Sequence, residues 1–387
     1  MQMAGLKKRV VSCPIIEKIE HGVVSLIAGW RGCTVQAAAN RTFACTIART
    51  WNPFRLNMTN SSSPTPLVFF RVLANQARSP AGLLMELGPG AAADVLPVFA
   101  GETFRALATE IPCYFRPALA APLAEALAEA GWKPLVLGTV LRADKNVPQE
   151  TVPAGTLLIE GDWYMQAPPK ATGAQAASQA LALQLAQLIA ADAHTHEIEA
   201  LLRKDPTLSY HLLRLVNSLG MGVGRRITSF TQAILILGRQ QLRRWVNLML
   251  FAARQGDVRS GMLLARVAVR GRLLEQLTRM GGGDKHAQDQ AFITGMFSLL
   301  GVLFGMELTE LLAPLSISDT VQHALLGYSG ELGQMLRLCE AFEDGDFAGV
   351  GAALGTLEIG VAAFNDAVVE ANRWMLGAID GATSASA

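Results

Sequence analysis

Histidines and cysteines are the side chains of this 387-residue protein that could hold a metal, and their spacing completes no site. A helical metallohydrolase needs imidazoles and carboxylates on facing helices, typically with an adjacent His-Asp pair between the metals. None of the six histidines precedes an aspartate, and His194 and His196 would point in different directions on a helix. The five cysteines form no C-x-x-C pair. We therefore expect no metal ion, no disulfide framework and a reducing compartment.

Phosphate-binding and nucleophile motifs are also incomplete. The dipeptide Gly-Lys is absent, which excludes a phosphate loop of the Walker type. Gly88-x-Gly90-x-x-Ala93 is similar to a dinucleotide fingerprint, but Pro89 stands inside it and favours a Gly-Pro-Gly turn. The segment 327–331 ends in Glu331 where a nucleophile elbow needs glycine. We expect no bound cofactor and no catalytic residue of these classes.

The composition describes a folded protein with little net charge. Apolar residues make up 51% of the chain and charged residues 17%, with a net charge of +1, which excludes long intrinsic disorder. The apolar run near the N-terminus is too short for a signal peptide. Two uncharged stretches, 171–191 and 290–306, contain glutamines or glycines, and we interpret them as buried or amphipathic helices. These features predict a cytoplasmic protein without a membrane partner.

The first half of the chain mixes strand and helix patterns. Short apolar runs bounded by glycine or charge predict strands at 23–27, 83–87, 135–141 and 157–159. Thr65 and Pro66 have the form of a helix start, with Leu67, Phe70 and Leu73 at helical spacing. A second helix is predicted over 121–130, where Pro122 would occupy the first turn. Alternation of the two patterns predicts an α/β layered structure.

A Pro/Gly-rich linker at 166–173 separates this half from an all-α second half. Asp205 and Pro206 form a helix start, and Ser229 with Gln232 forms a capping box whose helix ends at Gly238. Helical periods continue to about residue 376. We expect two domains, 1–168 and 169–387.

The second half divides by charge. Residues 203–279 carry fourteen basic and three acidic side chains, whereas residues 284–387 carry three basic and fourteen acidic ones. The two segments either neutralise each other in one domain, which we favour, or the basic one binds an acidic partner. The arginines of a candidate interaction surface are Arg225, Arg226, Arg239, Arg243 and Arg244. Trp245 lies on the apolar face of its helix, and we expect it in the core.

Motifs between residues 205 and 250 resemble the HDOD family. The matching positions are Asp205 and Pro206, Leu213 and Arg214, Asn217 and Ser218, Ile227, Ser229, Ala233 and Ile234, and Leu237 and Gly238. Further similarity extends over roughly 175–350. The resemblance implies an all-α fold related to HD phosphohydrolases without their metal ligands. Asn217 and Ser218 would end a helix and cap a loop.

The first half is similar to the EAL phosphodiesterase family, whose members bind two divalent ions on a TIM-barrel-like fold. Asn57 and Glu86 stand at positions similar to two of that family's metal ligands, but Leu137 and Gly138 replace its Asp-Asp pair. About 250 residues build a complete barrel, so the domain would be truncated. Loss of two carboxylates would remove the charge that holds the ions. The tripeptide Glu125-Ala126-Leu127 lies in an alanine-rich helix and is a product of composition.

These resemblances imply a bacterial signalling adaptor that has no catalytic activity. Its HDOD half would recruit a protein partner of unknown identity, and its EAL-like half would provide an interaction or homodimer surface. Two alternatives stay open, namely binding of cyclic di-GMP without turnover and binding of nucleic acid through the basic segment, which we consider weaker because few aromatic residues accompany the arginines. An active phosphodiesterase would need its carboxylates elsewhere in the chain.

Overall fold

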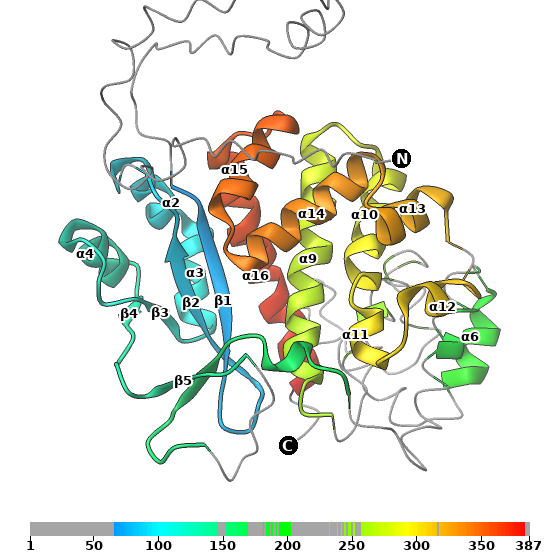
Figure 1. Cartoon of the computed structure of the whole chain (residues 1–387), viewed down its shortest axis with the longest axis horizontal. Helices are drawn as coiled ribbons and strands as arrows, with labels where there is room; N and C mark the ends of the chain where they lie inside the picture. The colour runs from blue at the N-terminus through cyan, green and yellow to red at the C-terminus, as the bar shows by residue number, and fades with distance from the viewer. Residues whose placement is uncertain are drawn as a thin grey trace, which may run out of the picture. The chain divides into compact units, whose positions relative to one another are not determined.

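The computed structural model describes residues 66–90, 92–144, 152–168, 257–315 and 317–383, with 193–202 and separate residues between 181 and 251 (Figure 1). The strand predicted at 23–27, Asn57 and most of the HDOD-like motif lie outside these ranges. The described residues belong to one compact unit that extends from Ser62 to Ala387.

A six-stranded mixed sheet forms the first half of this unit, in the order β4-β3-β2-β1-β6-β5. Its strands are β1 (Val68–Ala74), β2 (Pro80–Leu87), β3 (Cys113–Phe115), β4 (Lys133–Pro134), β5 (Val140–Arg142) and β6 (Leu158–Glu160). β1 is antiparallel to β2 and β6, whereas β2, β3 and β4 run parallel, as do β5 and β6. The strands predicted at 83–87 and 157–159 are confirmed by β2 and β6.

The helix predicted from Thr65 and Pro66 is wrong, because this segment forms β1. Its residues Val-Phe-Phe-Arg-Val-Leu-Ala are β-branched, aromatic or aliphatic for the most part, and they pair with β2 along their whole length. Both faces of the strand are largely buried. Apolar residues at six of the seven positions also satisfy a helical period, so the period alone could not distinguish the two structures.

The strand predicted at 135–141 is also wrong, because most of this segment is a turn between two strands. β4 ends at Pro134, and β5 begins only at Val140. The Thr139 amide donates to the Val136 carbonyl, and Gly138 has a φ of +84°, which places a tight turn between the two strands. The segment therefore joins two strands instead of forming one.

This short connection curves the sheet. β4 and β5 are the two edge strands, yet only residues 135–139 lie between them in sequence. Six Cα steps span at most about 22 Å. Five interstrand spacings of a flat sheet need about 24 Å, before any offset along the strands. The sheet is therefore rolled into a half-barrel, and Leu73, Leu84, Leu135 and Leu158 form a small separate apolar cluster.

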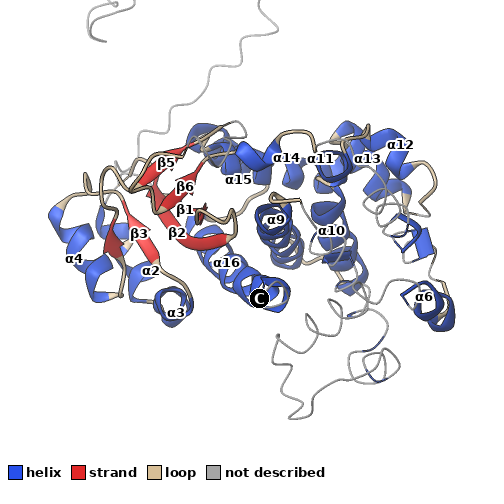
Figure 2. Ribbon diagram, turned by 90° about the horizontal axis from the view of Figure 1, so that it is seen from below, coloured by secondary structure: helices blue, strands red, loops and turns tan. Residues whose placement is uncertain are grey.

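Short helices pack against the sheet (Figure 2). They are η1 (Ala92–Asp94), α2 (Leu96–Ala100), α3 (Glu102–Glu110) and α4 (Ala121–Glu129). α4 confirms the helix predicted over 121–130, with its proline in the first turn. The ring of Trp132 stacks on those of Phe70 in β1 and Phe104 in α3, with centroids 5.6 and 4.8 Å away. These rings anchor the helices to the sheet.

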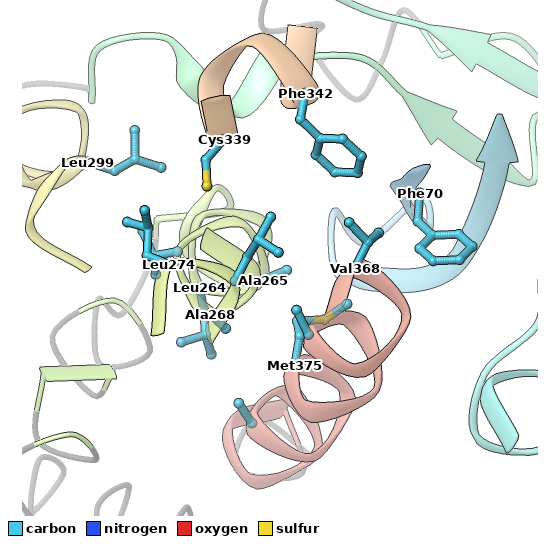
Figure 3. Close-up of a cluster of buried hydrophobic side chains, with 14 of the residues drawn as sticks. Phe70, Leu264, Ala265, Ala268, Leu274, Leu299, Cys339, Phe342, Val368 and Met375 are labelled. Carbon is cyan, nitrogen blue, oxygen red and sulfur yellow. The ribbon is translucent and has the colours of Figure 1, made fainter. Parts of the chain in front are cut away.

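Every described element after the sheet is helical, as predicted. The elements are η3 (Trp163–Met165), α6 (Thr195–Leu202), α9 (Ser260–Met280), α10 (Lys285–Phe297), α11 (Leu300–Phe304), α12 (Leu308–Leu312), α13 (Asp319–Gly327), α14 (Gly330–Asp344), α15 (Phe347–Thr356) and α16 (Val361–Thr383). α9 contacts α10, α14 and α16. Figure 3 shows side chains of α9, α14 and α16 meeting in this core.

The sheet and the helices share one continuous apolar core, which includes Phe70 of β1 and Val368 of α16. The buried Asn365 of α16 accepts a hydrogen bond from the Val68 amide and donates one to the Pro66 carbonyl, both at 2.9 Å. The last helix of the chain thus holds the beginning of the first strand, and contacts cross the domain boundary that we expect at residue 168. Among the helices described, none alone has the length and hydrophobicity to span a membrane; α15 and α16 meet the criteria only as a pair bent by 113°.

Candidate functional site

Glu86, which stands at an EAL-like position, lies near the end of β2 and is held by two arginines. Arg71 donates to one of its carboxylate oxygens at 2.9 Å, and Arg116 donates to the other at 2.9 Å. Arg116 also donates to Glu160 at the end of β6, again at 2.9 Å. A guanidinium group therefore lies between the two carboxylates at this end of the half-barrel.

The electrostatics of Glu86 follow from these contacts. Burial raises the pKa of its carboxyl, but the hydrogen bonds and charges of Arg71 and Arg116 outweigh burial, so the pKa lies below its usual value. The carboxylate is ionised and already saturated with donors. A divalent cation at Glu86 would have to displace Arg116, whose positive charge repels it.

The other EAL-like positions do not join Glu86. Leu137 is 83% exposed at the turn between β4 and β5, and Gly138 follows it in the same turn. Neither residue offers a ligand atom on its side chain. In the ranges that the structure describes, no group of three or more His, Cys, Asp or Glu side chains is arranged to hold a metal ion. The residues present therefore do not fit the two-metal site of an EAL enzyme.

A second charged cluster, which we call the Arg266 network, joins the half-barrel to the helices. It consists of Asp162, Tyr164, Arg266, Arg270 and Glu343. Arg266 of α9 donates to Asp162 at 2.7 Å and to the Tyr164 hydroxyl, and its Nε donates to Glu343 of α14 at 2.6 Å. Arg270, one turn later, binds both oxygens of Glu343.

Burial strengthens these ion pairs. Side-chain exposure is 11% for Arg266, 3% for Arg270 and 13% for Glu343. Burial raises the pKa of the Glu343 carboxyl. Arg270 and Arg266 lower this pKa by more than burial raises it, so the pKa lies below the ordinary value of a glutamate. The Glu343 carboxylate is thus ionised at neutral pH, and the network ties α9, α14 and η3 together.

A pocket of about 60 Å³ opens beside the Arg266 network. β1 contributes Arg71 to its wall, α9 contributes Arg266, and α16 contributes Asn372. Asp162 and Tyr164 come from the segment after β6. The pocket therefore lies where the half-barrel meets the helices, close to the end of β2 that carries Glu86. Ligand pockets are common where structural layers meet and a few polar groups converge beside an apolar wall, which makes this pocket a candidate site.

One member of the predicted arginine surface is wrongly assigned. Arg244 is 7% exposed, pairs with Glu275 and Asp289, and lies over the ring of Phe292 with its guanidinium carbon 4.8 Å from the centroid. It is a core residue, because a helix face that meets α9 and α10 cannot also face solvent. Arg225, Arg226, Arg239 and Arg243 lie outside the described residues, as do Asp205, Pro206, Arg214, Asn217, Ser218, Ser229 and Trp245. Gly238 is described and has a φ of +74°, which suits a residue that ends a helix.

Among the described residues, side chains of the basic and acidic segments pair with each other, as the favoured interpretation predicts. Ion pairs that join them are Arg244 to Asp289, Arg266 and Arg270 to Glu343, Arg270 to Glu340, and Arg272 and Arg279 to Glu370. The arginines of these pairs are therefore engaged inside the protein.

Comparison with known proteins identifies the helical region. Residues 177–318 match the HDOD domain. The chain is 33% identical over 177 residues to the cyclic di-GMP phosphodiesterase CdgJ of Vibrio cholerae, a match that covers 46% of this chain and 40% of that protein. It is 30% identical over 148 residues to the uncharacterized protein YuxH of Bacillus subtilis, covering 38% of this chain and 36% of that protein. The chain thus spans less than half of each relative by similarity. No solved structure matches it.

The match to the HDOD domain covers α6 and α9 to α12, whereas α13 to α16 follow it. Glu343 and Asn372 belong to these later helices, and Arg71 and Asp162 precede the domain. The pocket is therefore built from three parts of the sequence, and Met262, Arg266 and Val269 are its lining residues from the HDOD match. The sequence analysis did not predict this pocket. One signal was present: Arg266 and Arg270 are four residues apart, and Glu340 and Glu343 are three apart, which is the spacing of charged stripes on two helices that could face each other.

Proposed function

We propose that this protein is a non-catalytic adaptor of cyclic di-GMP signalling that acts through protein–protein contacts of its HDOD domain. The HDOD match and the name of the Vibrio cholerae relative support the link to this signalling system. The single observation that carries the absence of catalysis is the position of Arg116 between Glu86 and Glu160. A guanidinium in that place supplies the positive charge that a metal would otherwise supply, and it activates no water.

The shared core supports the adaptor role. Because α16 packs on β1 and α9 packs on η3, the half-barrel and the HDOD helices form one body. A rigid body of this kind presents fixed surfaces to a partner, which limits the entropy lost on binding. Sheet and helices would then act together as one scaffold.

Binding of cyclic di-GMP without turnover is the second candidate, and the relative's name is the observation that favours it. Binding of nucleic acid gains less support. Arg244, Arg266 and Arg270 of the basic segment pair with carboxylates of the protein, and their side chains are at most 11% exposed, so they offer no open basic surface to a phosphate backbone.

The first experiment mixes the full chain with cyclic di-GMP and Mg²⁺ or Mn²⁺ and follows the products by chromatography. We expect no hydrolysis above a protein-free blank, while an active cyclic di-GMP phosphodiesterase assayed in parallel consumes the substrate. Calorimetric titration of the same preparation distinguishes the two candidates, since binding without product identifies a sensor. Hydrolysis of cyclic di-GMP above the blank would overturn the proposal. If the Glu86→Gln variant hydrolysed it equally well, the reaction would take place elsewhere in the chain.

A further inference from the structure

The pocket beside the Arg266 network contains hydrogen-bonding groups that the protein itself does not use. Arg71 contacts Glu86 only through its Nε, so both of its terminal nitrogens make no hydrogen bond within the described part of the chain. The Nη2 of Arg266 is likewise unused among the described residues, since its Nε and Nη1 make all of its contacts. Two guanidinium groups thus line one pocket with free donors.

Acceptors are left over in the same pocket. Asn372 is 2% exposed and donates its amide to the Val368 carbonyl, but its side-chain oxygen accepts no hydrogen bond from any described residue. Asp162 uses one carboxylate oxygen for Arg266, and the other is free in the ranges described; its side chain is 44% exposed. Each of these two oxygens can accept a hydrogen bond from a group that enters the pocket.

The charges of the lining are balanced. Arg71 and Arg266 are positive, and Asp162 and Glu343 are negative. A simple anion would be attracted by the two arginines but repelled by the two carboxylates. A simple cation would be attracted by the carboxylates but repelled by the arginines. A group that carries both charges satisfies both sets.

The size of the pocket limits the ligand. Each water needs about 10–15 Å³ of such volume, so 60 Å³ holds only a few waters or a group of similar size. Phe70, Tyr164 and Phe342 form the apolar part of the wall. The space suits a group of about five or six heavy atoms.

We propose that this pocket binds a small zwitterion of the α-amino acid class with a short side chain. Its carboxylate would lie on Arg71 and Arg266, where charge-assisted hydrogen bonds are strongest. Its ammonium group would lie on Asp162 and the side-chain oxygen of Asn372. The proposal does not rest on the absence of catalysis, and it would give the protein a small-molecule input at the junction of sheet and helices.

The test is calorimetric titration of the full chain with glycine, L-alanine and L-serine. Acetate and methylammonium, which each carry half of the zwitterion, are titrated separately. Asp162→Asn removes the charge that would hold the ammonium group, and its exposed position spares the core. Arg142→Gln is the matched control, because Arg142 is 67% exposed on β5, pairs with Asp144 and does not line the pocket.

We expect at least one of the three amino acids to bind with 1:1 stoichiometry. Asp162→Asn should raise its Kd at least tenfold, and Arg142→Gln should leave the Kd unchanged. Circular dichroism establishes that both variants are folded. Binding of none of the three, equal binding of acetate alone, or an unchanged Kd in Asp162→Asn would each overturn the proposal.

Discussion

Glu343→Ala should lower the free energy of unfolding by about 3–5 kcal/mol, which is the cost of removing one partner from a buried ion pair. Glu343 accepts hydrogen bonds from Arg266 and from both Nε and Nη2 of Arg270. Without it, two guanidinium groups lose their common carboxylate. Arg270 keeps only Ser298 and the longer 3.4 Å contact to Glu340, which cannot replace a bidentate partner.

Asp344→Ala is the matched control for this prediction. Asp344 is the next residue of α14 and is exposed, so its removal should change the free energy of unfolding by no more than about 0.5 kcal/mol. Urea unfolding of the wild type and both variants measures the difference. Equal stability of Glu343→Ala and Asp344→Ala would show that the Arg266 network does not hold α9 to α14.

The same carboxylate makes stability depend on pH. The native pKa of Glu343 is lowered by Arg270 and Arg266 despite its burial, whereas an unfolded glutamate titrates near about 4.3. Its stabilising contribution is therefore complete above that pH and is lost as the pH falls towards the native pKa. The gap in unfolding free energy between wild type and Glu343→Gln should accordingly shrink between about pH 5 and pH 3.

Local patterns in the sequence predicted much of the secondary structure. α4 follows from an alanine-rich period with proline in its first turn, and the helical second half follows from repeated caps and periods. β1 was mistaken because apolar residues on both of its faces fit either period. Curvature of the sheet also escaped prediction, since it depends on which strands become edges, and pairing between distant segments decides that.

The candidate site was harder to predict than the fold. Glu86 was identified, but its arginine partners come from β1 and from the segment after β3. The pocket combines residues as distant in sequence as Phe70 and Asn372, which are 302 positions apart. Charge counting predicted that the basic and acidic segments meet, yet it could not predict that Arg244 is buried under Phe292. Such pairings are properties of tertiary packing.

Gly295→Ala should lower the free energy of unfolding by about 2 kcal/mol, although alanine is the better helix former. α9 and α10 cross at two glycines, Gly271 and Gly295. A Cβ on Gly295 would lie 2.5 Å from the Cα of Gly271 and 2.6 Å from its backbone nitrogen. These are backbone atoms that no rotamer change can move, so the helices must separate and the buried side chains around Phe292 must repack.

Gly351→Ala is the same substitution at another helix position, and we expect it to raise the free energy of unfolding instead of lowering it. Gly351 lies inside α15, and a Cβ there would meet no atom within 4 Å. Alanine should therefore stabilise the protein by about 0.5–1 kcal/mol through helix propensity alone. Thermal or urea unfolding of both variants separates the effect of helix propensity from that of the steric clash. Propensity contributes equally to the two variants, and only Gly295→Ala adds a clash. If both substitutions stabilised the protein, α9 and α10 would have to cross farther apart than the structure places them, and the core shared with the half-barrel would have to be rearranged with them.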